Sequence, residues 1–236
     1  MTASRPLDQL RPVKFELDYV MYPEGSVLIS MGNTRVLCNA TVEESLPRWL
    51  HNSKLKQGWV TAEYSMLPRA TAERTSRERN GPGGRTHEIQ RLIGRSLRAA
   101  MGTFAFGEYT IKVDCDVLTA DGGTRCASIT GACVALHDAC TWLSEKTGQP
   151  SPFGRLVAAI SVGTVDGEQR LDLAYLEDRD AEVDANVVML APHDFVEVQG
   201  TGEHGTFDRA ALDRLLDLAQ GGLNELFALQ RTALGL

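Results

Sequence analysis

A glycine-rich turn near the middle of the chain has the residue types of an anion-binding site. It reads Asp121-Gly122-Gly123-Thr124-Arg125 and joins an expected strand to an expected helix. Adjacent glycines let backbone N–H groups crowd together, a helix N-terminus attracts negative charge, and a hydroxyl and a guanidinium add donors. An ordinary strand-to-helix turn with a surface arginine has the same pattern, so this stretch alone leaves both interpretations open. It is not the phosphate loop of nucleoside triphosphatases, because no lysine follows the glycines.

Arginines gather in the segment that precedes this strand. Residues 69–85 hold five arginines and two glutamates, a local charge of +3 in a chain whose net charge is -7. The arginines are Arg69, Arg74, Arg77, Arg79 and Arg85. A solvated basic loop would have the same composition. The alternative is a surface that binds a polyanion such as RNA.

Carboxylates form a third candidate group, in the acidic run over residues 177–184. Mg2+ takes one or two carboxylates from a protein and completes its shell with water and phosphate oxygens, so Asp178 and Asp184 would suffice. Taken alone, such a run is more often a solvated loop. Together, the turn, the arginines and the carboxylates are the parts needed to hold a polyanionic chain, a free phosphate and a metal ion.

Hydrophobic patterning divides the chain into two similar halves, separated by the proline- and glycine-rich residues 148–154. Each half opens with a hairpin, around Gly32-Asn33 in the first and around Asp166-Gly167 in the second. The expected hairpins cover residues 25–42 and 156–176, and the expected strands cover 59–66, 109–117, 186–190 and 195–198. Three helices are expected. The first covers about 86–102, the second runs from the glycine turn to about 144 with one apolar stripe, and the third begins at about 207. An irregular connection over 43–57 is expected to fold Trp49 back onto the core, and residues 68–84 are expected to be a loop.

The sequence therefore predicts an α+β fold made by tandem duplication of a hairpin-strand-helix unit, with each sheet covered by helices on one side. We expect a single domain over residues 1–236 with internal halves 12–147 and 155–230. The five cysteines include no C-x-x-C pair and lie in apolar patterns, so they are expected to be reduced core residues. The absence of an apparent signal peptide or membrane span predicts a cytoplasmic protein without a membrane partner.

The residues Gly200, Gly202 and Gly205 formally match a dinucleotide-binding fingerprint, which offers an oxidoreductase as an alternative. A Rossmann unit needs a second parallel strand with an acidic end about 20 residues further on. Asp213 and Asp217 instead fall inside the expected last helix, so this alternative is weaker, and a cofactor absorbance scan would decide it.

Four longer strings resemble the bacterial ribonuclease PH family almost end to end, from about Arg11 to the last helix. They are G-W-V-T-A-E-Y-S-M-L-P-R, G-G-R-T-H-E-I-Q-R-L-I-G-R-S-L-R-A, D-C-D-V-L-T-A-D-G-G-T-R-C-A-S-I-T-G-A and N-V-V-M. The resemblance implies the ribonuclease PH fold and a phosphorolytic 3' to 5' exoribonuclease, also described as a tRNA nucleotidyltransferase. Such an enzyme trims the 3' ends of tRNA precursors and other structured RNAs reversibly, with inorganic phosphate as co-substrate, and releases nucleoside diphosphates. The resemblance also implies Mg2+ or Mn2+ as cofactor and a ring of six subunits built as a trimer of dimers.

The same resemblance assigns roles to individual residues. It assigns phosphate binding to Arg85, Gly123, Thr124 and Arg125. It assigns catalysis to Arg125, Asp178 and Asp184, and metal binding to the two aspartates. It assigns RNA contacts to Arg69, Arg74 and Arg77. Which aspartate is the general acid and which the metal ligand stays open. The chain departs from the family pattern at residues 51–57 and at Asn80-Gly81-Pro82. A non-catalytic RNA-binding ring subunit of the same fold is a further alternative, and retention of the site residues argues against it.

Overall fold

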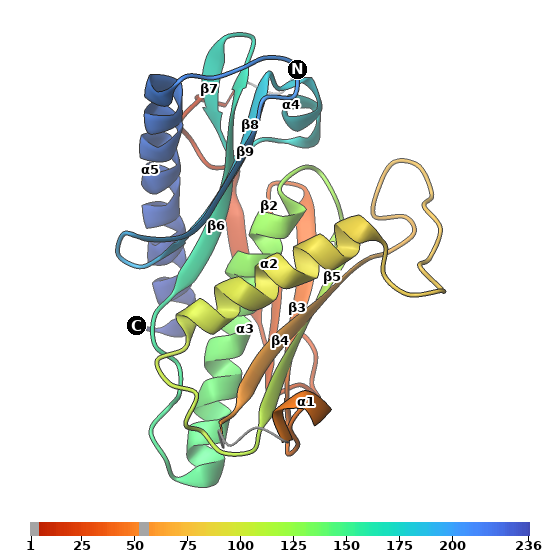
Figure 1. The fold of residues 1–236 in the computed structure, drawn as a ribbon, viewed down its shortest axis with the longest axis vertical. Helices are drawn as coiled ribbons and strands as arrows, with labels where there is room; N and C mark the ends of the chain where they lie inside the picture. Colours follow the sequence, from red (N-terminus) through yellow and green to blue (C-terminus); the bar gives the residue numbers. More distant parts are fainter. Residues whose placement is uncertain (1–4, 52–56) are drawn as a thin grey trace.

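The computed structural model describes residues 5–51 and 57–236, and its two sheets with packed helices confirm the predicted α+β fold class (Figure 1). Neighbouring strands of the first sheet are antiparallel, except that β4 runs parallel to β5. In order across this sheet, the strands are β1 (Val13–Leu17), β2 (Gly25–Met31), β3 (Thr34–Glu43), β5 (Thr110–Thr119) and β4 (Trp59–Met66).

The second sheet is antiparallel throughout. Its strands, in order, are β7 (Glu168–Leu171), β6 (Val157–Val165), β8 (Val183–Leu190) and β9 (Asp194–Thr201). The helices are α1 (Arg48–His51), α2 (Gly84–Ala100), α3 (Thr124–Thr147), α4 (Tyr175–Asp180) and α5 (Arg209–Leu234). Both predicted hairpins are confirmed, because β2 pairs with β3 and β6 pairs with β7 around the expected turns.

The helix α3 lies between the two sheets. On one side its Gly131 packs so closely on β2 that a Cβ there would lie 2.6 Å from the side chain of Ile29. On the other side Cys126 contacts Asn186 of β8 at 3.2 Å. Every residue from Cys126 to Leu136 is buried, so this part of the helix is enclosed on all sides rather than along one apolar stripe as predicted.

The second sheet has helices on both faces, where the sequence predicts one. Cys126 of α3 contacts the side chain of Asn186, which is paired with Ser161 of β6. Gly222 of α5 packs against the side chain of Leu171, which is paired with the next residue of β6, Val162. Successive residues of a strand point to opposite faces, so the two helices lie on different sides of the sheet. The near-continuous burial of β6 follows from this arrangement.

Other local predictions meet mixed outcomes. The five cysteines are free and buried, as predicted. Trp49 does not fold back onto the core, because its side chain is 59% exposed and packs edge-on against Trp59, with ring centroids 4.9 Å apart. Part of the acidic run is the short helix α4 rather than a connection. Most of the predicted departure at 51–57 lies outside the described residues.

The described part of the chain contains no helix that is both long and apolar enough to cross a membrane.

Candidate active site

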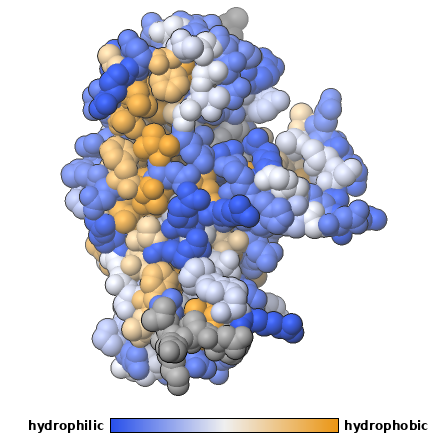
Figure 2. All heavy atoms as spheres, in the orientation of Figure 1, coloured by the Kyte–Doolittle hydropathy of each residue, from blue (hydrophilic) through white to orange (hydrophobic). Residues whose placement is uncertain are grey.

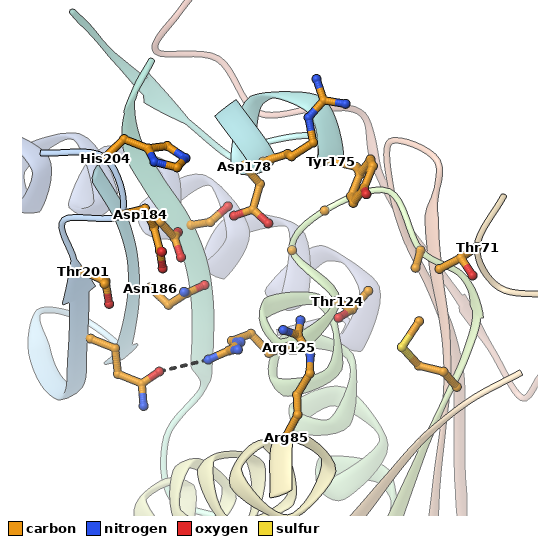
Figure 3. A pocket seen from close by; sticks show the side chains of 18 residues that line it. Thr71, Arg85, Thr124, Arg125, Tyr175, Asp178, Asp184, Asn186, Thr201 and His204 are labelled. Carbon is orange, nitrogen blue, oxygen red and sulfur yellow. Dashed lines mark hydrogen bonds between the residues drawn. The ribbon is translucent and has the colours of Figure 1, made fainter. Parts of the chain in front are cut away.

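A cleft of about 530 Å³ lies where the N-terminus of α3 faces α4 and β8 (Figure 3). The residues predicted for phosphate binding, metal binding and catalysis all line it, namely Arg85, Gly123, Thr124, Arg125, Asp178 and Asp184. They come from α2, the glycine turn with α3, α4 and β8. The fold thus brings the candidate anion site and the candidate carboxylate pair, which are distant in sequence, to one cavity.

The glycine turn requires its two glycines. Gly122 and Gly123 both have left-handed backbone angles, with φ of 76° and 66°. A Cβ on Gly122 would also lie 2.8 Å from the backbone nitrogen of Tyr175. Gly123 is the N-cap of α3 and supplies no side-chain cap, so the first N–H groups of the helix stay available at the cleft.

A buried ion pair between Arg11 and Asp172 holds this turn in place through hydrogen bonds to its backbone. Arg11 donates to both carboxylate oxygens of Asp172, through Nε at 2.9 Å and Nη2 at 2.7 Å, and its Nη1 donates to the carbonyl oxygen of Asp121. The hydroxyl of Thr34 accepts from the Asp121 amide at 2.9 Å and donates to the Gly122 carbonyl at 2.7 Å. No sequence pattern predicts these roles of Arg11, Thr34 and Asp172.

The guanidinium of Arg125 is held in the cleft by neutral and acidic partners. Its Nη1 donates to Gln199 Oε1 at 3.1 Å, the dashed line in Figure 3, and to Glu88 Oε1 at 3.2 Å. The Thr124 hydroxyl lies 3.0 Å from the hydroxyl of Tyr64. Arg85 extends from the first turn of α2 toward the start of α3. Two guanidinium groups and a hydroxyl therefore converge on the helix N-terminus, which is the arrangement that binds a phosphate.

The two aspartates reach the cleft from the opposite side. Burial raises the pKa of Asp184 to about 6, and the charge of Asp178 adds to the rise while Arg125 opposes it. Burial also raises the pKa of Asp178, against the charges of Arg85 and Arg125. Oδ1 of Asp184 is buried without a hydrogen-bond partner among the described residues. A proton or a cation would satisfy that oxygen.

The donor set fits a hard cation bound in part by substrate. Within residues 5–51 and 57–236, no three His, Cys, Asp or Glu side chains are grouped closely enough to hold a metal by themselves. Mg2+ uses few protein carboxylates and relies on water and phosphate oxygens. Asp178 and Asp184, with the orphaned oxygen of the latter, could therefore hold it beside a bound phosphate.

The RNA-contact candidates lie outside the cleft. Arg69, Arg74 and Arg77 are exposed on the loop between β4 and α2, which extends away from the body of the molecule (Figure 1). Figure 2 shows that the surface of this projecting part is mostly hydrophilic. Only Arg69 of these lines a described cavity, a groove of about 900 Å³ that adjoins the cleft at Thr71, Ala120 and Tyr175. The loop carries no regular element in its described part, as predicted.

Further cleft residues escaped the sequence analysis. They include Ser161, Tyr175, Asn186, Gln199, Thr201, Glu203 and His204. Thr201 is the last residue of β9 and Glu203 and His204 follow it, in the segment whose glycines match a dinucleotide fingerprint. Gly200 lies in an antiparallel edge strand, so the parallel unit required for dinucleotide binding is absent there.

A two-sheet α+β fold whose cleft sets two arginines and a helix N-terminus opposite paired carboxylates has the groups that a phosphoryl-transfer enzyme needs. The chain belongs to the 3' exoribonuclease family, whose domain 1 model matches residues 9–141 and whose domain 2 model matches residues 155–222. The chain is 55% identical over 231 residues to the ribonuclease PH of Mycolicibacterium smegmatis, covering 96% of this chain and 88% of that protein. It is 57% identical over 233 residues to the ribonuclease PH of Corynebacterium diphtheriae, covering 98% and 95%.

Solved structures share the fold at lower identity. A rice Rrp46 crystal structure superposes with a TM-score of 0.78 at 18% identity, covering 98% of each chain. A chain of an Archaeoglobus fulgidus exosome with RNA bound to the active site superposes with a TM-score of 0.80 at 20% identity, covering 94% of this chain and 89% of that one. The resemblance to the ribonuclease PH family and the predicted fold are thereby confirmed.

Proposed function

We propose that this chain is a phosphate-dependent 3' to 5' exoribonuclease that trims tRNA precursors and other structured RNAs and releases nucleoside diphosphates. The observation that carries the proposal is the meeting of Arg85, Thr124 and Arg125 with Asp178 and Asp184 in one cleft. The identity of 55% and 57% to two ribonuclease PH proteins supports it.

Inorganic phosphate binds between Arg85, Arg125, the Thr124 hydroxyl and the free N–H groups of the glycine turn. One of its oxygens attacks the phosphorus of the terminal phosphodiester, in line with the departing 3' oxygen of the shortened RNA. Phosphate is already a nucleophile, so no strong base is needed. The protein's task is to place two anions together and to offset the charge that builds up, mainly through the arginines.

We assign proton delivery to Asp184 and the main metal contact to Asp178. A carboxyl whose pKa burial raises to about 6 is partly protonated near neutral pH, and Asp184 can therefore donate a proton to the leaving 3' oxygen. Burial also raises the pKa of Asp178, but the charges of Arg85 and Arg125 oppose that rise and favour its ionised form. Mg2+ or Mn2+ held mainly by Asp178 would neutralise charge on the phosphate oxygens.

The wider organisation follows from the family resemblance. We propose one domain with halves 12–147 and 155–230, and a cytoplasmic ring of six subunits arranged as a trimer of dimers. Arg69, Arg74 and Arg77 contact the body of the tRNA, which their exposure on the extended loop supports. These contacts reach the RNA backbone and are independent of base sequence.

The other functions considered have less support. A non-catalytic RNA-binding subunit would not need the proposed phosphate and acid residues, and this chain keeps all of them around the cleft. A nucleotide-dependent oxidoreductase would need a parallel dinucleotide-binding unit near Gly200, where the sheet is antiparallel.

The proposal is tested by incubating the protein with a 3'-extended tRNA, with and without phosphate, and identifying the released nucleotide. Nucleoside diphosphates should appear only with phosphate, and excess nucleoside diphosphate should extend the RNA instead. Release of monophosphates without added phosphate would identify a hydrolase and overturn the proposal.

A further inference from the structure

We propose that Tyr175 is a stacking platform for one of the two terminal bases of the RNA, at the boundary between the active-site cleft and the adjoining groove. The inference rests on the proposed function, since it names a contact for the same substrate. Tyr175 is the first residue of α4, and its side chain is 55% exposed. It lines both the cleft of about 530 Å³ and the groove of about 900 Å³.

The ring is placed where the RNA must pass if its terminal phosphodiester reaches the aspartates. In Figure 3 the side chains of Asp184, Asp178 and Tyr175 follow one another across the mouth of the cleft, and Thr71 of the groove lies beyond. A strand whose scissile phosphate lies near Asp178 therefore has a base within reach of Tyr175. Tyr175 contributes little to the core, because the residue as a whole is 55% exposed.

Hydrogen bonds hold the start of α4, so the backbone that carries the Tyr175 ring is fixed. The Ala174 amide donates to Glu177 Oε2 at 2.9 Å, and Glu177 is held in turn by Arg170 at 2.8 Å and Arg5 at 3.2 Å. The backbone of Tyr175 also packs directly on Gly122 of the phosphate turn. A base stacked there would keep a constant position relative to the bound phosphate, because the same turn supports both.

The groove favours stacking over charge as the source of binding. Its charged lining consists of Arg35 and Arg69 against Glu73 and Asp121, so the formal charges cancel. An exposed aromatic ring beside an RNA cleft binds any base through its π-face. That tolerance suits an enzyme that removes successive nucleotides whatever their sequence.

The test uses short single-stranded RNA oligonucleotides with one abasic nucleotide at successive positions from the 3' end. On intact RNA, Tyr175→Ala should lower kcat/KM on the order of tenfold, while Tyr175→Phe stays near the wild type. An abasic nucleotide at one position, either the last or the penultimate, should lower kcat/KM of the wild type by a similar factor. The same abasic RNA should lower kcat/KM of Tyr175→Ala almost no further. Phosphate affinity should not change in either variant.

Two controls separate stacking from other effects. Tyr22→Ala removes a tyrosine that is 83% exposed and lines neither cavity, and it should behave like the wild type on every substrate. The loss in Tyr175→Ala should be the same at low and high salt, because no charge is removed. Matching thermal unfolding of Tyr175→Ala and Tyr22→Ala excludes a folding defect.

Equal abasic penalties in the wild type and Tyr175→Ala at both terminal positions would overturn this inference, as would an unchanged kcat/KM of Tyr175→Ala on intact RNA. Either result in a protein that still releases nucleoside diphosphates leaves the proposed function standing. Failure of the wild type to release diphosphates would instead contradict the proposed function itself.

Discussion

Arg11 and Asp172, 161 residues apart in the chain, form a two-point ion pair beside the glycine turn at Gly122 and Gly123. Both side chains are buried, and the Asp172 carboxylate also accepts the backbone N–H of Arg11 at 2.9 Å. The guanidinium reaches past Asp172 to the carbonyl oxygens of Asp121 and, at 3.5 Å, of Gly122. The pair therefore ties the start of the chain and the second sheet to the turn that precedes α3.

Asp172→Asn should destabilise the protein by about 3–5 kcal/mol, because it leaves the buried charge of Arg11 without its partner. The measurement is the free energy of unfolding in urea. Asp213→Asn, which breaks an exposed pair with Arg209 on α5, should change that free energy by less than about 1 kcal/mol. Equal small effects of the two variants would show that the Arg11–Asp172 pair does not stabilise the turn.

Arg125→Ala should weaken phosphate binding at least about tenfold, since each charge-assisted hydrogen bond to an anion is worth about 1.5–3 kcal/mol. RNA binding should stay close to that of the wild type. Isothermal titration with phosphate and a separate RNA-binding assay measure the two effects. Arg155→Ala, which removes a surface arginine paired with Asp194, is the control and should bind phosphate normally. Normal phosphate affinity in Arg125→Ala would remove this residue from the site.

Asp184→Asn should abolish turnover while leaving phosphate and RNA binding intact, because the substitution removes only the proton donor. Turnover on a 3'-extended tRNA, beside binding of each ligand, distinguishes the two effects. Substantial phosphorolysis by Asp184→Asn would show that Asp184 does not carry the proton.

The pH dependence of stability tests the environment of Asp184 independently. Its pKa in the folded state is about 6, above the ordinary value of 3.8, so the folded protein holds this proton more tightly than the unfolded chain does. The contribution of Asp184 to wild-type stability should therefore fall as pH rises from about 4 to about 6. In metal-free and phosphate-free buffer, Asp184→Asn should be more stable than the wild type above pH 6, on the order of 2 kcal/mol, and similar to it near pH 4. A difference in unfolding free energy between the two proteins that stays the same across this pH range would contradict the raised pKa. The control is Asp217→Asn, on the exposed side of α5.

Much of the fold and part of the site are predictable from the sequence because their signals are local. The alternation in β5 and the glycines before α3 place Thr124 and Arg125 at a helix N-terminus without reference to the rest of the chain. The environment of α3 is a long-range property, so its burial on all sides is not predicted by a search for one stripe. The helix α4 has six residues, too few for helical periodicity to appear.

The residues that support the site leave no such signal. Arg11, Asp172 and Gln199 are single polar residues whose sequence neighbourhoods resemble solvated surface, and only the pairing of distant segments gives them buried partners. His204 belongs to a glycine-containing segment whose one recognisable pattern points to another kind of site. A polar residue's role in a cleft is fixed by tertiary contacts, which one sequence does not display.

Replacing Arg69, Arg74 and Arg77 together by Ala should weaken tRNA binding. The slope of the logarithm of the binding constant against the logarithm of salt concentration should become shallower by up to about three. Turnover of a short oligonucleotide should change much less, because that substrate reaches only the cleft. The measurement is kcat/KM on both substrates at two salt concentrations. A variant with Arg209, Arg214 and Arg231 replaced by Ala removes the same charge from α5 and should retain tRNA turnover. Equal losses on both substrates in the loop variant would show that these arginines serve catalysis or assembly instead.

In the proposed reaction, phosphate held by Arg85, Thr124 and Arg125 is the attacking group. Supplying 18O-labelled inorganic phosphate with a 3'-extended tRNA and determining the products by mass spectrometry tests this role. The label should appear in the β-phosphate of the released nucleoside diphosphates, and the labelled product should be lost in Arg125→Ala. Unlabelled nucleoside monophosphates, formed at the same rate with or without the labelled phosphate, would contradict this role of phosphate.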